Sequence, residues 1–541
     1  MTATLPEQLS VIEASGHHWD WVVVGTGPGG ATFGHALARK GHSVLFVERG
    51  FATHGNSLRI ASRYPEEDSR FTADPSARAD LLRRSGRWSE ILHDQSTAKP
   101  RPFTPFIGSG TGGSSALYGM VMERFFPSDF EGDGLARARW PFDYDELLPY
   151  YIAAERLYGV QGERDPLRQE SVAQDSPSDS PTLNREHRWL REHLDAQGLH
   201  PYRVPVACAL LSQCEGCQGV LCPHPCKRDA ASQCLMPALR DHGARLLTGC
   251  TVQRLHANGP EVRAVELVDS QGLSHQLLCR NVALAAGALV TPHILMRSAS
   301  EQAPSGLANR SGLVGRNLMR HAIDLYAVPL PPQACPPDDL RQKQLAFNDW
   351  YDRDGVKLGS VQSFGKLPPG TVVATDLRNS AQAALGHWVG SVLQPMEGLL
   401  AKIVDRQFEQ RLLLAATLED TAQASNRVLP ACNGDDRLRI HYRLPPGDLP
   451  RLQIMRSRMR KALAPHGVSL LKQAENNQRI AHACGTARAG LSPATSVLTA
   501  HCRTHDVGNL WVIDGSFFPS SGGTNPSLTI AANALRVAAS L

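Results

Sequence analysis

The stretch "WDWVVVGTGPGGATFGHALARKGHSVLFVERG", residues 19–50, decides the fold. Its β-branched run at residues 22–24 predicts a short strand, and residues 31–40 favour a helix that Gly41 can end. Between them, residues 25–30 read GTGPGG and match the pattern G-x-G-x-x-G. Because an apolar run follows at residues 44–47, the stretch predicts a βαβ unit and therefore an α/β, Rossmann-like domain.

The glycine turn has the chemistry of a dinucleotide site. Gly25 permits the tight turn, Gly27 lets the backbone approach a pyrophosphate, and Gly30 allows the helix to pack closely on the strand. Glu48 ends the second strand, where its carboxylate can accept the hydroxyl hydrogens of an adenosine ribose. The glycine pattern alone is a weak signal, but its place between strand and helix, with this acid after it, predicts dinucleotide binding.

Composition excludes several other classes of protein. A chain of 541 residues is too long for one hydrophobic core and predicts two large domains. The 56 basic and 52 acidic residues are scattered along the chain, so no basic face for nucleic acid or anionic membrane is expected. No apolar run approaches the roughly eighteen residues of a membrane span. Since the first basic residue is Arg39, we expect no secretory signal and a cytoplasmic location.

Two further glycine-rich stretches lie far apart in the sequence. Residues 106–130 read "FIGSGTGGSSALYGMVMERFFPSDF" and residues 513–535 read "IDGSFFPSSGGTNPSLTIAANAL". The first stretch by itself is equally consistent with a flexible loop.

Together with "HACGTARAG" at residues 482–490, these stretches resemble the glucose/methanol/choline family of flavin-dependent alcohol oxidoreductases. The resemblance covers nearly the whole chain, and the order and spacing of its pieces are specific. It implies an FAD-binding domain assembled from separated segments and a second, α+β substrate domain built on an antiparallel sheet. The expected FAD domain comprises residues 17–135, 235–322 and 476–541, and the expected substrate domain comprises residues 136–234, with a cysteine-rich loop at 208–234, and 323–475.

The resemblance also implies which residues contact FAD. It places the strand of Val252 near the adenine, Asp514 and Gly515 beside the phosphate–ribityl chain, and the helix that begins near Pro526 beneath the isoalloxazine. The full set of expected cofactor-binding residues is Gly25, Gly27, Gly30, Glu48, Gly112, Gly113, Ser114, Val252, Ala286, Gly287, Asp514, Gly515, Asn525 and Pro526. Tyr118 stands where many members carry Asn, so contacts there are expected to differ. No histidine is positioned for covalent attachment, which predicts noncovalent FAD.

The resemblance assigns His482 as the active-site histidine and Asn525 as the second catalytic position. Alcohol oxidation independently requires a base near neutral pH, which imidazole supplies, and an amide can donate a hydrogen bond to the developing alkoxide. His321, His501 and His505 are expected to be structural. The sequence therefore predicts oxidation of a primary or secondary alcohol, such as a sugar or polyol, by hydride transfer to flavin N5.

The reduced flavin could be reoxidised by molecular oxygen, as in an oxidase, or by a quinone or cytochrome partner, as in a dehydrogenase. The cysteine cluster mildly favours the dehydrogenase. A lyase or photodecarboxylase on the same scaffold, or a flavin-binding electron-transfer subunit, is the alternative.

A cysteine cluster between residues 208 and 234 has three interpretations. Short spacing lets the thiolates of Cys214, Cys217, Cys222 and Cys226 converge on one metal centre. The alternatives are an iron–sulfur cluster, which some bacterial members of the family carry in the corresponding loop, a structural zinc ion, and buried or paired cysteines without metal. We expect a metal-bearing loop, with the iron–sulfur cluster as a hypothesis.

Overall fold

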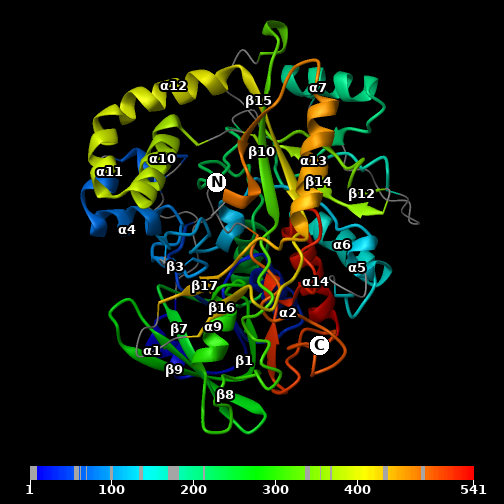
Figure 1. Cartoon of the computed structure of the whole chain (residues 1–541). Helices are drawn as coiled ribbons and strands as arrows, with labels where there is room; N and C mark the ends of the chain where they lie inside the picture. Colours follow the sequence, from blue (N-terminus) through cyan, green and yellow to red (C-terminus); the bar gives the residue numbers. More distant parts are fainter. Residues whose placement is uncertain are drawn as a thin grey trace.

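The computed structural model builds the chain around two large sheets, with the nucleotide-type sheet in the lower half of the view and the second sheet in the upper half (Figure 1). It describes residues 9–541 except 54–59, 61, 69, 98–100, 133–137, 169–181, 211–213, 336–341, 354, 366–367, 431–436 and 477–481. Within these ranges, every helix is too short or too polar to cross a bilayer.

The first sheet has the strand order β6-β2-β1-β9-β8-β7, with β19 also paired to β9. Strands β6, β2, β1, β9 and β19 run parallel to one another, whereas β7, β8 and the first part of β9 form an antiparallel meander. The bounds are β1 His18–Val24, β2 Val44–Glu48, β6 Arg245–Thr248, β7 Thr251–Asn258, β8 Glu261–Val268, β9 Ser274–Leu284 and β19 Leu510–Val512.

Three helices from distant parts of the chain pack together beside this sheet. The helix α14 Ser527–Ala539 contacts both α2 Pro28–Arg39 and α6 Tyr144–Tyr158, while α9 Val290–Arg297 contacts β7. The predicted strand–turn–helix–strand unit is confirmed. The helix begins at Pro28, earlier than the predicted residue 31, because the fixed φ of proline suits the first helical position and needs no N–H there.

The second sheet is antiparallel at every described pairing and has the order β18-β10-β15-β14-β11-β5. Its strands are β5 Tyr202–Arg203, β10 Ala322–Pro329, β11 Leu345–Phe347, β14 Gly359–Ser363, β15 Arg411–Leu418 and β18 Ser469–Lys472. The helices α7 Arg185–Ala196 and α13 Asp448–Ala462 contribute to the same buried core as this sheet. A Rossmann-like domain joined to an α+β domain is the fold predicted from the sequence, whereas the exact domain boundaries stay a prediction.

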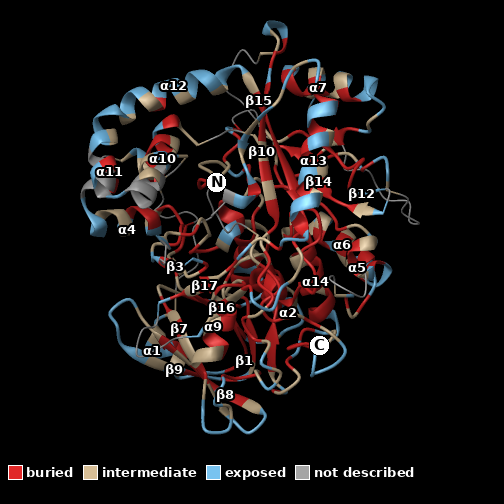
Figure 2. Cartoon of the chain, in the orientation of Figure 1, coloured by how far each residue is buried: buried red, intermediate tan, exposed pale blue. Residues whose placement is uncertain are grey.

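A helical lobe extends the second half of the molecule. It consists of α10 Gly370–Leu385, α11 His387–Leu393 and α12 Glu397–Glu409, and α12 is largely exposed (Figure 2). The sequence predicts that residues 323–475 belong to an α+β domain built on an antiparallel sheet but does not locate these helices.

The remaining elements are short. They are α1 Val11–Ser15, α3 Arg70–Ala73, α4 Pro75–Arg84, α5 Ser128–Glu131, α8 Met236–Asp241, β12 Asp352–Arg353, β13 Val356–Lys357 and the small sheet of β3 Leu92–Asp94, β4 Arg101–Phe103, β16 Arg427–Leu429 and β17 Arg439–His441.

Candidate active site

A cavity of about 420 Å³ is lined by residues of both large sheets. At one end lie the ends of β1 and β2 and the start of α2, and at the other lie side chains of β10, β14, β15 and β18. The C-terminal segment at residues 514–530 contributes to the same lining. Segments that are hundreds of residues apart therefore share one site, as the resemblance implied.

The glycines of the first turn create room at the cofactor end. Gly25 has φ +100°, and a Cβ there would lie 2.4 Å from the carbonyl oxygen of Ala285. Gly113 has φ +53°, and its Cβ would lie 2.9 Å from Cα of Gly27. Because these positions tolerate no side chain, the two glycine loops can approach each other and leave their backbones open to the cavity.

Glu48 lies at the cavity wall with its carboxylate already held in place. Its Oε2 accepts hydrogen bonds from the backbone N–H and the hydroxyl of Thr26, at 3.2 and 2.7 Å, and Oε1 accepts from the N–H of Gly50 at 3.0 Å. Burial is the main cause that raises the pKa of Glu48, and these three hydrogen bonds oppose it. The carboxylate is thus oriented at the end of β2, where a ribose hydroxyl can reach it.

Asp514 connects the C-terminal segment to the turn after β9. Its Oδ2 accepts hydrogen bonds from the N–H of Gly287 at 2.8 Å and from the hydroxyl of Thr291 at 2.5 Å, and Oδ1 accepts from the N–H of Ser516 at 2.8 Å. Burial raises the pKa of Asp514 against these stabilising bonds. The helices α2 and α14 both begin beside the cavity without a side-chain cap, so their first-turn amides can bind an anionic group.

Most of the predicted site residues lie together in this cavity. The residues that line it are Gly25, Gly27, Glu48, Gly113, Ser114, Val252, Ala286, Gly287, His482, Asp514, Gly515, Asn525 and Pro526. Gly30 and Gly112 do not line it. A Cβ on Gly30 would lie 2.1 Å from the carbonyl oxygen of Gly25, so this glycine permits the predicted packing of helix on strand, and Gly112 lies against Ala231. The open glycine cradle, the oriented carboxylate and the uncapped helices fit FAD.

His482 lines the cavity and is bonded to a second histidine. Its Nδ1 lies 2.9 Å from Nδ1 of His321, and Nε2 of His321 lies 2.8 Å from the carbonyl oxygen of Ser521. A carbonyl can only accept, so His321 carries its hydrogen on Nε2 and, when neutral, accepts on Nδ1. His482 must then donate from Nδ1, which leaves the lone pair of the neutral ring on Nε2.

The pKa of His482 is lowered well below its usual value of 6.5. Burial is the largest cause, and the nearby basic groups His321 and Lys343 further disfavour protonation of His482. His321, which was expected to be structural, has a φ of 62°, and its ring contacts His482. Asp420 supports this conformation, because its Oδ1 accepts hydrogen bonds from the N–H of His321 and the hydroxyl of Ser521, both at 3.0 Å.

Asn525 is oriented by a glutamine of the second sheet. Its Oδ1 accepts a hydrogen bond from Nε2 of Gln362 at 2.8 Å. Nδ2 of Asn525 has no partner among the residues that the structure describes, so this amide can donate to a ligand in the cavity. The structure therefore brings a basic nitrogen and a hydrogen-bond donor, 43 positions apart in the sequence, into one cavity.

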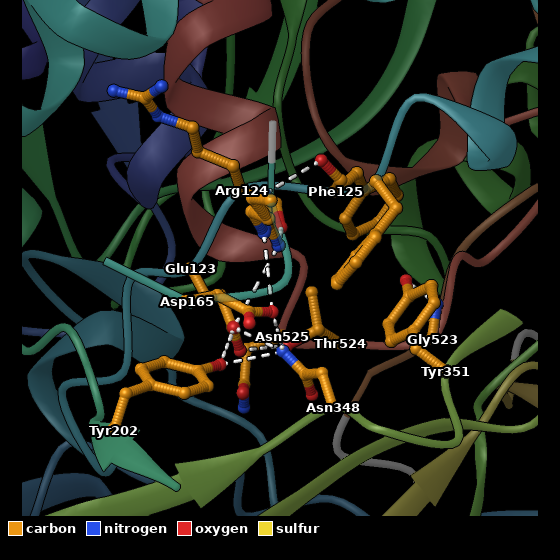
Figure 3. Close-up of polar contacts among 12 residues, drawn as sticks. Glu123, Arg124, Phe125, Asp165, Tyr202, Asn348, Tyr351, Gly523, Thr524 and Asn525 are labelled. Carbon is orange, nitrogen blue, oxygen red and sulfur yellow. Dashed lines mark hydrogen bonds and ion pairs between the residues drawn. The ribbon is translucent and has the colours of Figure 1, made fainter. Parts of the chain in front are cut away.

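A buried polar network holds the segment that carries Asn525 (Figure 3). The hydroxyl of Thr524 donates to Oε2 of Glu123 at 2.8 Å, while Nδ2 of Asn348 donates to Oε1 of Glu123 at 3.0 Å and to Oδ2 of Asp165 at 2.9 Å. The N–H of Gly523 donates to the hydroxyl of Tyr351 at 2.7 Å. Sequence reasoning missed this network, because its members lie in four separate segments without a shared motif.

Tyr118, which replaces the asparagine common in the family, lines the cavity beside the second glycine loop. Its hydroxyl donates to the backbone carbonyl of Arg228 at 2.5 Å. Burial raises the pKa of Tyr118 well above its usual value, so the hydroxyl stays a donor. Tyr118 thus ties the glycine loop to the cysteine-rich loop at residues 208–234.

Five described cysteines of the 208–234 loop, all except Cys234, form a chain of thiol contacts. Sγ of Cys208 lies 3.8 Å from Sγ of Cys214, and Cys226 contacts both Cys214 and Cys222, which in turn contacts Cys217. Contact with the neighbouring thiols raises the pKa of Cys208 and Cys217 and lowers that of Cys214 and Cys222. Among the described residues, no group of three or more His, Cys, Asp or Glu is arranged to hold a metal ion.

Comparison with known proteins identifies relatives over nearly the whole chain. Models of the family described as GMC oxidoreductase match residues 93–323 and 424–534. Paromamine 6'-oxidase of Streptomyces fradiae is 30% identical over 96% of this chain and 90% of that protein. 2-methyl-1,2-propanediol dehydrogenase of Mycolicibacterium austroafricanum is 26% identical over 96% of this chain and 94% of that protein. The crystal structure of pyridoxine 4-oxidase from Mesorbium loti superposes with a TM-score of 0.61 at 22% identity, covering 97% of this chain and 99% of that one, which confirms the predicted fold.

Proposed function

Because the chain belongs to the GMC oxidoreductase family, whose members oxidise alcohol groups with FAD, we propose that His482 is its general base and Asn525 its alcohol-binding residue. The observation that carries the assignment is the hydrogen bond between His482 and His321. This bond occupies Nδ1 of His482 and leaves Nε2 as the basic nitrogen of a residue that lines the cavity.

The residues of the chain then have separate tasks. Nε2 of His482 takes the hydroxyl proton, and Nδ1 keeps its hydrogen bond to His321, so the imidazolium that forms has an acceptor waiting for it. The amide of Asn525 donates to the alcohol oxygen as negative charge develops there, with Gln362 fixing its orientation. The chemistry that bound FAD supplies is acceptance of the hydride from the carbinol carbon.

The substrate class and the electron acceptor are finer proposals. The relatives include an oxidase and a dehydrogenase that are named for hydroxylated compounds, which supports a sugar, polyol or related metabolite as the substrate. Because one relative is an oxidase and the other a dehydrogenase, the electron acceptor can be oxygen or a quinone or cytochrome partner. We prefer the proposal that this chain is a dehydrogenase. A cytoplasmic location stays a prediction.

We further propose that FAD is held noncovalently. The support is that His482 is the single histidine among the described residues that line the cavity, and its proposed task leaves it unavailable for a bond to flavin. Acid precipitation of the protein should release the flavin into the supernatant, whereas yellow colour that stays with the pellet would contradict the proposal.

The cysteine loop enters this proposal only as a hypothesis. An iron–sulfur cluster that passes electrons to a partner is supported by the spacing of Cys214, Cys217, Cys222 and Cys226, and the described thiol positions do not by themselves form a metal site. No catalytic step is therefore assigned to it.

The decisive experiment replaces His482 with alanine and measures anaerobic bleaching of the flavin by a panel of sugars and simple alcohols. We expect the variant to keep its flavin absorbance and to lose at least about 100-fold in the rate of bleaching, since general-base catalysis contributes roughly 10²–10⁴-fold. His501→Ala, which removes an exposed histidine outside the cavity lining, is the matched control and should bleach at the wild-type rate. Bleaching of the His482→Ala protein within about tenfold of wild type would refute the assignment. A wild-type flavin that no alcohol bleaches would favour the lyase or electron-transfer alternatives.

A further inference from the structure

The two ends of the cavity differ in charge. The acidic residues of its described lining, Glu48 and Asp514, lie at the cofactor end, where both are hydrogen bonded to the protein. The lining contributed by the second sheet and the segment before it contains Lys343 and Lys472 and no carboxylate among its described residues. A ligand at this end therefore meets the positive charge of Lys343, for which the described lining offers no carboxylate.

Lys343 is a half-buried lysine that has no acidic partner among the described residues. Among the residues that the structure describes, its side chain makes no hydrogen bond or ion pair, and its nitrogen lies 5.4 Å from the ring centre of Phe364. Burial lowers the pKa of Lys343 to about 8, so the charged form still predominates at pH 7. Its charge also reaches the site, because it contributes to the lowered pKa of His482.

Two acceptors of the same cavity lining also have no hydrogen-bond partner among the described residues. Oε1 of Gln218 and Oε1 of Gln362 are buried and have no hydrogen-bond partner within the described part of the chain. A Cβ on Gly119 would lie 2.9 Å from Nζ of Lys343 and 3.2 Å from Oε1 of Gln218, so both groups flank the same glycine at the cavity wall. A half-buried donor and two buried acceptors without partners are costly, and a ligand that satisfies them recovers that cost.

We propose that the cavity recognises a hydroxylated substrate that carries an anionic group, a carboxylate or a phosphate, with Lys343 as the ion-pair partner of that group. The oxygens of Gln218 and Gln362 accept hydrogen bonds from the other hydroxyls of the substrate. This inference rests on the proposed function for the identity of the reacting group, and it names the substrate class of that same site.

The physical basis is the low polarity around the ammonium. A charge that has already lost much of its hydration pairs with a ligand anion at little further cost to the protein, and the pair is stronger there than at an exposed surface. A ligand ammonium in the same place faces a like charge, and a neutral polyol leaves the lysine unpaired. The site should therefore bind the anionic compound most tightly and the amine most weakly.

The test uses the flavin-loaded protein and matched probes. D-gluconate is compared with D-glucose and D-glucosamine, and glycerol 3-phosphate is compared with glycerol and 2-amino-1,3-propanediol. Binding is measured by the change that each compound causes in the visible flavin spectrum, and reaction is measured separately by anaerobic bleaching. The variants are Lys343→Met and Lys343→Arg, and Lys402→Met, at an exposed lysine of α12, is the control.

We expect an anionic probe to bind at least about tenfold more tightly than its neutral partner, in line with a charge-assisted hydrogen bond. Lys343→Met should remove that preference and leave the neutral probe within about threefold, while Lys343→Arg and Lys402→Met should retain it. The gluconate and phosphate arms show which anion the site prefers. Spectral changes caused by anions without any bleaching would support this inference and count against the proposed function.

Other results overturn the inference while the proposed function stands. They are bleaching by a neutral or amino compound with no advantage for the matched anion, equal losses for all probes in Lys343→Met, or no spectral response to either anion in a protein that neutral alcohols bleach. Flavin content and thermal stability of each variant, measured beside wild type, identify a variant that has failed to fold. If Lys343→Met fails to fold, the preference for anionic over neutral probes is compared between Lys343→Arg and wild type.

Discussion

Replacing His321 should impair the reaction although this residue is not expected to touch the substrate. His321→Leu removes the ring that accepts a hydrogen bond from His482 and donates one to the carbonyl of Ser521. The side chain of His482 would then be free to rotate and to place its hydrogen on either nitrogen. His321→Asn is the matched variant, because its Oδ1 can take the place of Nδ1 and asparagine tolerates the φ of 62°.

The size of the effect follows from the bond that is lost. A hydrogen bond to a charged group contributes about 1.5–3 kcal/mol, and the bond to His321 reaches its full strength only when His482 becomes the imidazolium. Since about 1.4 kcal/mol corresponds to a factor of ten, flavin reduction in His321→Leu should slow by roughly 10- to 150-fold. His321→Asn should recover most of this loss, because it restores the acceptor that the imidazolium needs.

Anaerobic stopped-flow reduction of the flavin measures this step apart from reoxidation. We expect kcat to fall more than KM rises in His321→Leu, since the lost interaction strengthens as the proton moves. Unchanged flavin content would show that the cavity is intact. A leucine variant within about threefold of wild type, or an asparagine variant as slow as the leucine variant with its flavin retained, would refute the proposed task of His321.

The other predictions concern pH, the cofactor and the cysteines. Because burial lowers the pKa of His482, the neutral base persists as pH falls through 6.5, so the rate of flavin reduction should stay level from about pH 8 to about pH 6 and decline only below that. Removing the charge in Lys343→Met should raise the pKa of His482 and move this decline toward higher pH. An unchanged pH profile of flavin reduction would contradict the electrostatic effect of Lys343 on His482. Glu48→Gln should weaken FAD rebinding to the apoprotein by roughly tenfold or more, since a charged acceptor is lost, and equal affinity would be the contrary result. Anaerobically purified protein should contain iron or zinc if the cysteine loop binds metal, and metal analysis that finds neither would exclude that hypothesis.

The local parts of the fold were predictable because they depend on neighbouring residues. Strand β1, the glycine turn and α2 follow from hydrophobic periodicity and from the conformations that only glycine allows. Glu48 followed from its place at the end of β2. The C-terminal contribution to the cavity was expected from the family resemblance alone, since no periodicity relates residue 25 to residue 514.

Contacts between distant segments escaped prediction. A Cβ on Gly29 would lie 1.9 Å from the carbonyl oxygen of Ile513, so this glycine lets the C-terminal segment pass over α2. The sequence pattern leaves that position open to any residue. The contact of His321 escaped prediction for the same reason, because it joins residues 161 positions apart and involves an unusual φ. Both contacts depend on how distant segments of the chain pack in three dimensions.

The electrostatics of the second domain make Lys343 stand out. Arg456 pairs with Asp324 at 2.8 Å, and Lys357 lies 2.9 Å from Glu419 and also contacts Asp129. These buried cations therefore have acidic partners within the protein. Removing one partner would leave the other as an unpaired buried charge, which is strongly destabilising. Lys343 has no such acid among the described residues, and it lies at the cavity wall. A fold that pairs those charges internally but leaves this one facing the cavity makes the ligand the natural source of the missing negative charge.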